Sequence, residues 1–109
     1  MGEGAEFEVG AAHGVVRDGV AMATDGSAMA GSVATMIGTV QNMVESVGVS
    51  VAEAVRMASL NPARALGIGG HKGSLEPRKD ADIVIFSTSF EVVKTLIGGR
   101  VAFEAAGVV

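Results

Sequence analysis

The chain has two histidines, His13 and His71, which are its first candidates for metal binding or general acid–base chemistry. They are far apart in the sequence, and neither is followed by a second histidine or a carboxylate at the spacing that places two ligands on one face of a helix. The chain has no cysteine, which excludes a thiolate zinc site and a disulfide framework. From these residues we predict no metal site in this chain.

Two pairs of carboxylates are the next candidates. Glu6 and Glu8 alternate with Phe7, as expected on the solvent face of a strand. Asp80 and Asp82 come just before a β-branched run, where aspartates commonly form turns. Neither context supplies the apolar pocket or charged neighbour that divides a carboxylate pair into an acid and a base. We therefore interpret both pairs as structural.

Serines and glycines give no catalytic signature either. Ser27 and Ser32 each follow a glycine but lack the Gly-x-Ser-x-Gly pattern of a nucleophile elbow. The glycines at 67–70 end a predicted helix, whereas a dinucleotide-binding loop opens one. Gly73 and Ser74, beside Lys72, could hold an anion through backbone N–H groups, although a plain turn is the simpler interpretation. The residues alone therefore indicate no active site.

Composition limits the class of protein. With 109 residues the chain is one modest domain at most, and its 4 phenylalanines are its only aromatic residues. A net charge of −4 with scattered Lys and Arg argues against a nucleic-acid partner. No apolar run reaches membrane-spanning length, and the first residues do not resemble a signal peptide. These features, with the lack of cysteine, predict a cytoplasmic protein without a membrane partner.

The elements that must position any site fall into three blocks. Residues 7–29 are predicted to form short strands, because the dipeptides Asp18-Gly19 and Asp25-Gly26 are strong turn signals between apolar runs. Residues 81–86, 92–97 and 101–103 are predicted to form further strands, the last two joined by a hairpin at 98–100.

The middle block is predicted to be a helical hairpin. From Ser32 the apolar residues recur at steps of three and four up to a Gly48 cap, which places them on one face of a helix: Val33, Met36, Ile37, Val40, Met43, Val44 and Val47. The opposite face has Glu45 as its only charge. That face is suited to lie against more protein, although a weakly polar exposed face explains it equally well.

The second helix is predicted to begin at Ser50, which forms a capping box with Glu53, and to run to about residue 60. Asn61 and Pro62 are expected to break it and start one further turn, with Asn61 as the cap. Gly67 is expected to end that turn.

Several longer motifs resemble one known family. They are residues 25–32 (Asp-Gly-Ser-Ala-Met-Ala-Gly-Ser), 56–64 (Arg-Met-Ala-Ser-Leu-Asn-Pro-Ala-Arg), 72–75 (Lys-Gly-Ser-Leu) and 79–84 (Lys-Asp-Ala-Asp-Ile-Val). Their types and order resemble the C-terminal segment of the N-acetylglucosamine-6-phosphate deacetylase family, within the amidohydrolase superfamily. Arg78 departs from this resemblance, because the family favours glycine there; if the position needs a positive φ, Arg78 stores strain.

The resemblance implies a mixed α/β fold, with the C-terminal remnant of a metal-dependent (β/α)8 barrel in the form of a helical hairpin, plus part of a small β-sandwich. Residues 1–28 and 71–109 would be sandwich strands, and residues 29–70 the barrel-end loop and terminal helices. Met29, Ala30 and Gly31 would lie at the barrel mouth and contact the bound sugar phosphate, where a glycine permits close approach.

The implied parent enzyme would use a divalent metal, zinc or similar, to hydrolyse N-acetylglucosamine 6-phosphate to glucosamine 6-phosphate and acetate. The family's metal ligands and catalytic Asp are expected upstream of Met1. This chain alone is therefore predicted to bind no metal and to be inactive. Two alternatives remain open at this point. One is a standalone non-enzymatic module that binds a partner, either the missing barrel or a copy of itself as a homo-oligomer. The other is a fragment of another amidohydrolase, one acting on a cyclic amide or a nucleobase.

Overall fold

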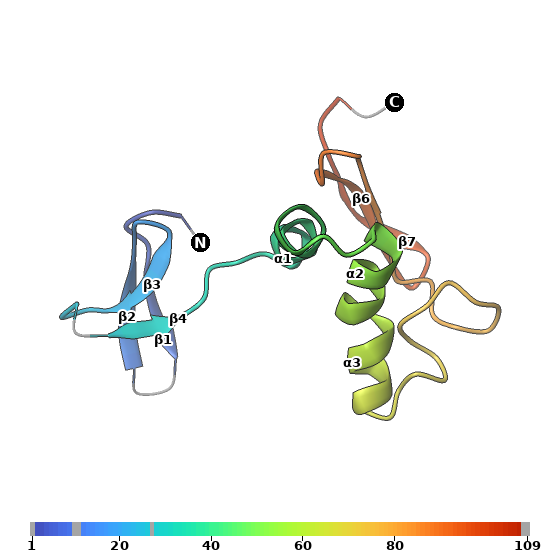
Figure 1. The fold of residues 1–109 in the computed structure, drawn as a ribbon, viewed down its shortest axis with the longest axis horizontal. Helices are drawn as coiled ribbons and strands as arrows, with labels where there is room; N and C mark the ends of the chain where they lie inside the picture. The colour runs from blue at the N-terminus through green and yellow to red at the C-terminus, as the bar shows by residue number, and fades with distance from the viewer. Residues whose placement is uncertain (1, 10–11, 27, 108–109) are drawn as a thin grey trace. The chain divides into compact units, whose positions relative to one another are not determined.

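The computed structural model describes residues 2–9, 12–26 and 28–107. The chain is mixed α/β and divides into two compact units, Met1–Thr35 and Met36–Val109 (Figure 1). The first unit contains one antiparallel sheet, and the second contains the helices and another antiparallel sheet. Among the described residues, none of the helices combines the length and hydropathy needed to span a bilayer.

The first unit is a four-stranded meander. Its strands are β1 (Glu6–Val9), β2 (Ala12–Arg17), β3 (Val20–Ala23) and β4 (Met29–Gly31), and they pair in chain order. The predicted hairpin at Asp18 and Gly19 is confirmed: both have positive φ, 51° and 72°, as a two-residue turn requires. The carboxylate of Glu3 accepts hydrogen bonds from both backbone N–H groups, at 2.7 and 3.1 Å. The turn is therefore fixed by its own backbone and by one distant side chain.

The interior of this sheet is small. Val16 and Ala21 are buried, at 1% and 3% exposure. Phe7 on β1 lies directly across from Gly14 on β2. A β-carbon added at Gly14 would lie 2.1 Å from the Phe7 ring and 2.6 Å from the carbonyl oxygen of Met22. The ring thus occupies the space that any other residue at position 14 would need.

The first helix of the second unit is α1 (Met36–Asn42), which continues as a π-helical turn, η1 (Met43–Val47), and ends at Gly48 with φ of 90°. The Gly48 cap is confirmed, but the predicted start at Ser32 was wrong by four residues. The Ser32 hydroxyl instead accepts a hydrogen bond from the backbone N–H of Ala34, a local bond that competes with helix. Only Val40 of the predicted face is fully buried, and Met36 remains 64% exposed.

Two short helices follow, α2 (Val51–Ala58) and α3 (Leu60–Ala65). Ser50 caps α2 as predicted, because its hydroxyl accepts from the backbone N–H of Glu53 at 3.2 Å. The predicted break at Asn61 was wrong by two residues: it falls at Ser59, whose hydroxyl bonds back to the carbonyl of Val55. Pro62 sits in the first turn of α3, where its missing N–H costs no helical bond. Asn61 is therefore inside α3 and does not cap it.

The break at Ser59 is where a later loop docks. Gly73, with φ of 97°, places its backbone against the start of α3. A β-carbon there would lie 2.8 Å from that of Ala63, 3.0 Å from the α-carbon of Leu60 and 3.1 Å from the carbonyl oxygen of Ser59. After α3, Gly67 ends the helical segment with φ of 75°, as predicted. The loop at 71–74 and the α2–α3 break therefore fit only because position 73 has no side chain.

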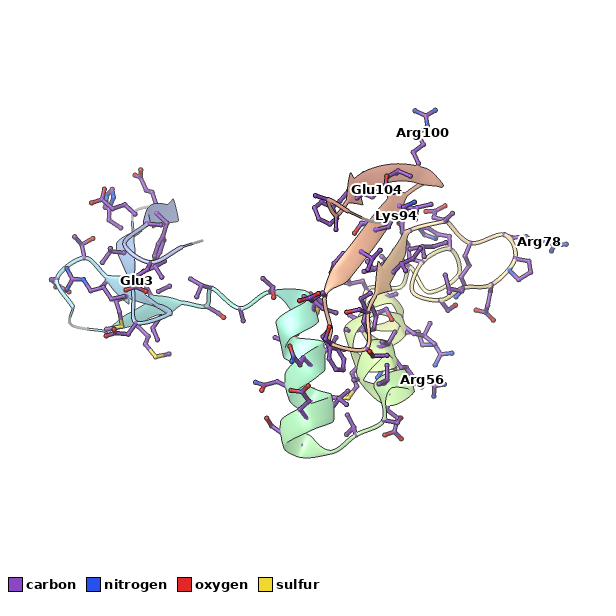
Figure 2. All side chains as sticks on the ribbon, turned by 90° about the horizontal axis from the view of Figure 1, so that it is seen from above. Glu3, Arg56, Arg78, Lys94, Arg100 and Glu104 are labelled. Carbon is purple, nitrogen blue, oxygen red and sulfur yellow. The ribbon has the colours of Figure 1, made fainter. Side chains whose placement is uncertain are left out.

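The second sheet contains β5 (Ile83–Phe86), β6 (Val92–Ile97) and β7 (Arg100–Glu104) in that order. The three predicted strands are confirmed, although β5 begins at Ile83 and the prediction began at residue 81. Gly98 and Gly99 form the β6–β7 turn with φ of 57° and 78°. Figure 2 shows Lys94 and Glu104 together on this sheet, where they form an ion pair of 3.0 Å.

Candidate functional site

The residues predicted to contact substrate, Met29, Ala30 and Gly31, form strand β4 at the edge of the first sheet. All three are exposed, and Met29 is 73% exposed. β4 pairs with β3 on one side, with an irregularity between Ala21 and Met22, and its other edge is not paired with any described strand. A β-carbon added at Gly31 would meet nothing within 4 Å. The segment is thus an exposed edge strand with an accessible backbone.

The two histidines lie in different units. His13 on β2 faces Glu8 on β1, with 3.7 Å between Nε2 and Oε1, and both side chains are exposed. His71 lies in the loop after α3. Ser27, considered above as a possible nucleophile, lies outside the described residues. Within 2–9, 12–26 and 28–107, no three His, Cys, Asp or Glu side chains are placed to hold a metal ion. Since a catalytic zinc ion needs three protein ligands, the Glu8–His13 pair does not fit one.

Asp80 and Asp82 are joined through Lys72. The Lys72 ammonium lies 3.0 Å from Asp80 Oδ2 and also donates to Asp82 Oδ2. Asp82 Oδ1 accepts from the backbone N–H of Gly98 at 2.9 Å. Hydrogen bonds to Asp82 and then Asp80 raise the pKa of Lys72, and bonds from Lys72 and Gly98 lower the pKa of Asp82. Through these contacts Asp80 and Asp82 connect Lys72, in the loop after α3, and the β6–β7 turn to the start of β5. This agrees with the interpretation of the two aspartates as structural residues.

The loop at 73–79 is closed by a second cluster. Lys79 Nζ lies 2.7 Å from Ser74 Oγ and 3.0 Å from Glu76 Oε2, and the Ser74 hydroxyl donates to Glu76. The Ser74 bond and then Lys79 lower the pKa of Glu76. The Ser74 hydroxyl donates to Glu76 and the Gly73 backbone packs against α3, so both residues have structural roles in this loop. Arg78 follows with φ of 73°, so the condition under which it stores strain is met, and its side chain projects away from the loop (Figure 2).

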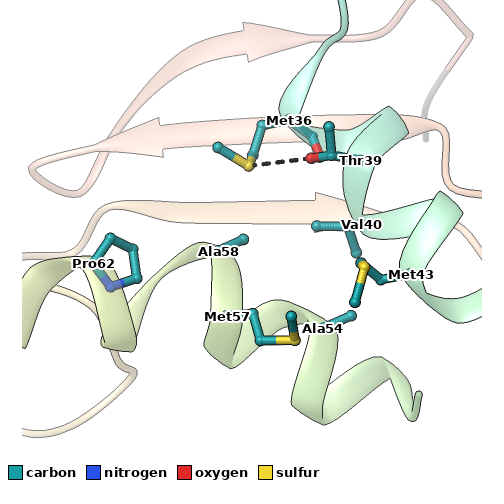
Figure 3. A pocket seen from close by; sticks show the side chains of 8 residues that line it. All are labelled: Met36, Thr39, Val40, Met43, Ala54, Met57, Ala58 and Pro62. Atoms are coloured by element: carbon teal, nitrogen blue, oxygen red, sulfur yellow. Dashed lines mark hydrogen bonds between the residues drawn. The ribbon is translucent and has the colours of Figure 1, made fainter. Parts of the chain in front are cut away.

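An apolar hollow between the helices was missed by sequence reasoning. It has a volume of about 340 Å³ and is lined by Met36, Thr39, Val40 and Met43 from α1 and η1, and by Ala54, Met57, Ala58 and Pro62 from α2 and α3 (Figure 3). Its one hydroxyl, on Thr39, donates to the carbonyl of Met36 at 2.7 Å. The lining therefore offers apolar contact and no acid or base. The signal for it was present in the methionines at 36, 43 and 57, two of them on one helical face.

Comparison with known proteins gives this geometry a context. The model of the amidohydrolase family matches residues 7–102. The chain belongs to the amidohydrolase family. The amidohydrolase chain is 41% identical over 56 residues to the N-acetylglucosamine-6-phosphate deacetylase of Haemophilus influenzae, which is 51% of this chain and 15% of that protein. It is 47% identical over 58 residues to a putative N-acetylgalactosamine-6-phosphate deacetylase of Escherichia coli K12, covering 53% of this chain and 35% of that protein.

Solved structures agree. Over 88% of this amidohydrolase chain, the fold matches the crystal structure of the N-acetylglucosamine-6-phosphate deacetylase from Pasteurella multocida, with a TM-score of 0.80 and 33% identity. The match covers 25% of that enzyme. The chain thus resembles a segment of amino-sugar-phosphate deacetylases and spans between about a seventh and a third of the length of these relatives.

Proposed function

We propose that this chain is the C-terminal part of a hydrolase that removes the acetyl group from N-acetylglucosamine 6-phosphate, giving glucosamine 6-phosphate and acetate. The observation that carries the proposal is the match of 88% of the chain to a quarter of a solved deacetylase at a TM-score of 0.80. The match includes both sheets and the helices, so it extends well beyond one shared motif. In this reading residues 29–70 contribute a barrel-end loop and helices, and residues 1–28 and 71–109 contribute β-sandwich strands.

Within that enzyme, β4 would be the part of this chain that contacts the sugar phosphate. Its three residues are exposed, and Gly31 has open space where a β-carbon would be, so a ligand can approach the backbone closely. Met29 adds a flexible, apolar side chain beside that backbone. These residues bind and orient; none of them can transfer a proton.

The metal-dependent step would be supplied by residues outside this chain. A bound metal would supply Lewis-acid activation of water in such an enzyme, and the described residues of this chain do not form a site for one. On this proposal the isolated chain releases no acetate, with or without added zinc.

A chimera tests the proposal. Residues 7–102 would replace the matching segment of the Pasteurella multocida deacetylase, whose structure matches 88% of this chain, and acetate release would be measured with the 6-phosphates of N-acetylglucosamine and N-acetylgalactosamine. We expect turnover of the first substrate. N-acetylgalactosamine 6-phosphate is included because the putative N-acetylgalactosamine-6-phosphate deacetylase of Escherichia coli K12 is 47% identical to this chain over 58 residues. A folded chimera that hydrolyses neither substrate would refute the proposal, and so would robust acetate release by the 109-residue chain alone.

Gly31→Ala in the same chimera tests the role of β4. A methyl group at that position meets no atom of this chain within 4 Å, so the unfolding midpoint should not change. If the sugar phosphate approaches the backbone there, KM should rise while kcat changes little. An unchanged KM would exclude Gly31 from the binding site.

A second candidate is a non-enzymatic binding module, favoured by the apolar hollow and by the exposed Met36 and Met57 beside it. This candidate predicts a chimera without activity and a chain that forms a complex when its partner is supplied. The chimera separates the two candidates, because turnover of N-acetylglucosamine 6-phosphate is expected only of the enzyme fragment, and analytical size measurement on the chain alone shows whether it binds a copy of itself.

A further inference from the structure

We draw no further inference here: the strongest candidate, the apolar hollow that Met36, Met43 and Met57 line between α1 and α2, is an unpartnered face of a chain that spans 25% of the solved deacetylase it matches, and nothing in the structure shows what covers it.

Discussion

Gly73 has a φ of 97°, and its α-carbon faces the break between α2 and α3. An alanine at this position adds two costs. The backbone conformation disfavours a side chain by about 1–2 kcal/mol. The new methyl group would lie 2.8 Å from the β-carbon of Ala63 and 3.0–3.1 Å from backbone atoms that cannot rotate away, which costs roughly 1–3 kcal/mol. After the smaller entropy of the unfolded alanine chain is taken into account, Gly73→Ala should lose about 2–4 kcal/mol.

Gly70→Ala is the matched control, because it makes the same chemical change in the same loop. A β-carbon there meets nothing within 4 Å, and Gly70 is not among the residues with positive φ. The two variants share the unfolded-state effect, so the difference between their midpoints reports the two native-state costs at position 73 together, the positive φ and the contact with α3. Urea unfolding, followed by helical circular dichroism, should place the Gly73→Ala midpoint roughly 2 M below that of Gly70→Ala, for a slope of about 1.5 kcal/mol/M.

Equal midpoints for the two variants would refute the reasoning. Equal midpoints would mean that Gly73 does not contact the α2–α3 break in solution, or that the break rearranges around the new methyl group without loss of stability. A fall in both midpoints would also contradict it, since the control has no atom to collide with.

Three further changes are predicted to alter stability. Gly14→Ala should destabilise the first sheet by about 2–3 kcal/mol in thermal unfolding, because the methyl group collides with the Phe7 ring and with the carbonyl oxygen of Met22. Adding Phe7→Ala should remove the collision with the ring and leave the one with the backbone oxygen, and an unchanged midpoint in Gly14→Ala would contradict the prediction. Arg78→Gly should raise stability by about 0.5–1 kcal/mol by relieving the positive φ, and Arg78→Val should lower it; equal midpoints would contradict this. The pKa of Asp82 is lower in the folded chain than its ordinary value of 3.8, so the charged carboxylate stabilises the fold above pH 3.8, and this stabilisation is lost as the pH falls through the lower folded pKa. Asp82→Asn should therefore reduce the loss of stability between pH 6 and pH 2, measured by denaturation at both pH values, and an unchanged loss would contradict the prediction.

Local signals predicted much of the fold. The turns at Asp18-Gly19 and Gly98-Gly99 and the Ser50 cap were predictable because each depends on residues adjacent in the chain. The break at Ser59 was not, because a serine hydroxyl that bonds back to Val55 is compatible with a continuous helix. The role of Gly73 was also hidden, since it depends on a contact with α3 that brings separate segments together.

The candidate site was predicted in a different way. Met29, Ala30 and Gly31 were selected through a family resemblance, and no periodicity in the sequence marks them. These residues form an exposed edge strand because they pair with β3. A segment of three residues is too short for its sequence to predict that pairing. The apolar hollow was not predicted, because a methionine that lines a pocket has the same position in the helical repeat as a methionine packed in the core.

The π-helical turn at Met43–Val47 has a consequence for how relatives of this chain can differ in length. A π turn holds one more residue than an α turn over the same rise, so it absorbs a single inserted residue without ending the helix. Deleting one residue from this turn would restore regular α-helix and leave α1 intact on one side and the Gly48 cap on the other. If two relatives differ by one residue at this point, the difference would therefore be a local change of helical pitch. The residues of α1 before the turn and the Gly48 cap after it would keep their packing neighbours.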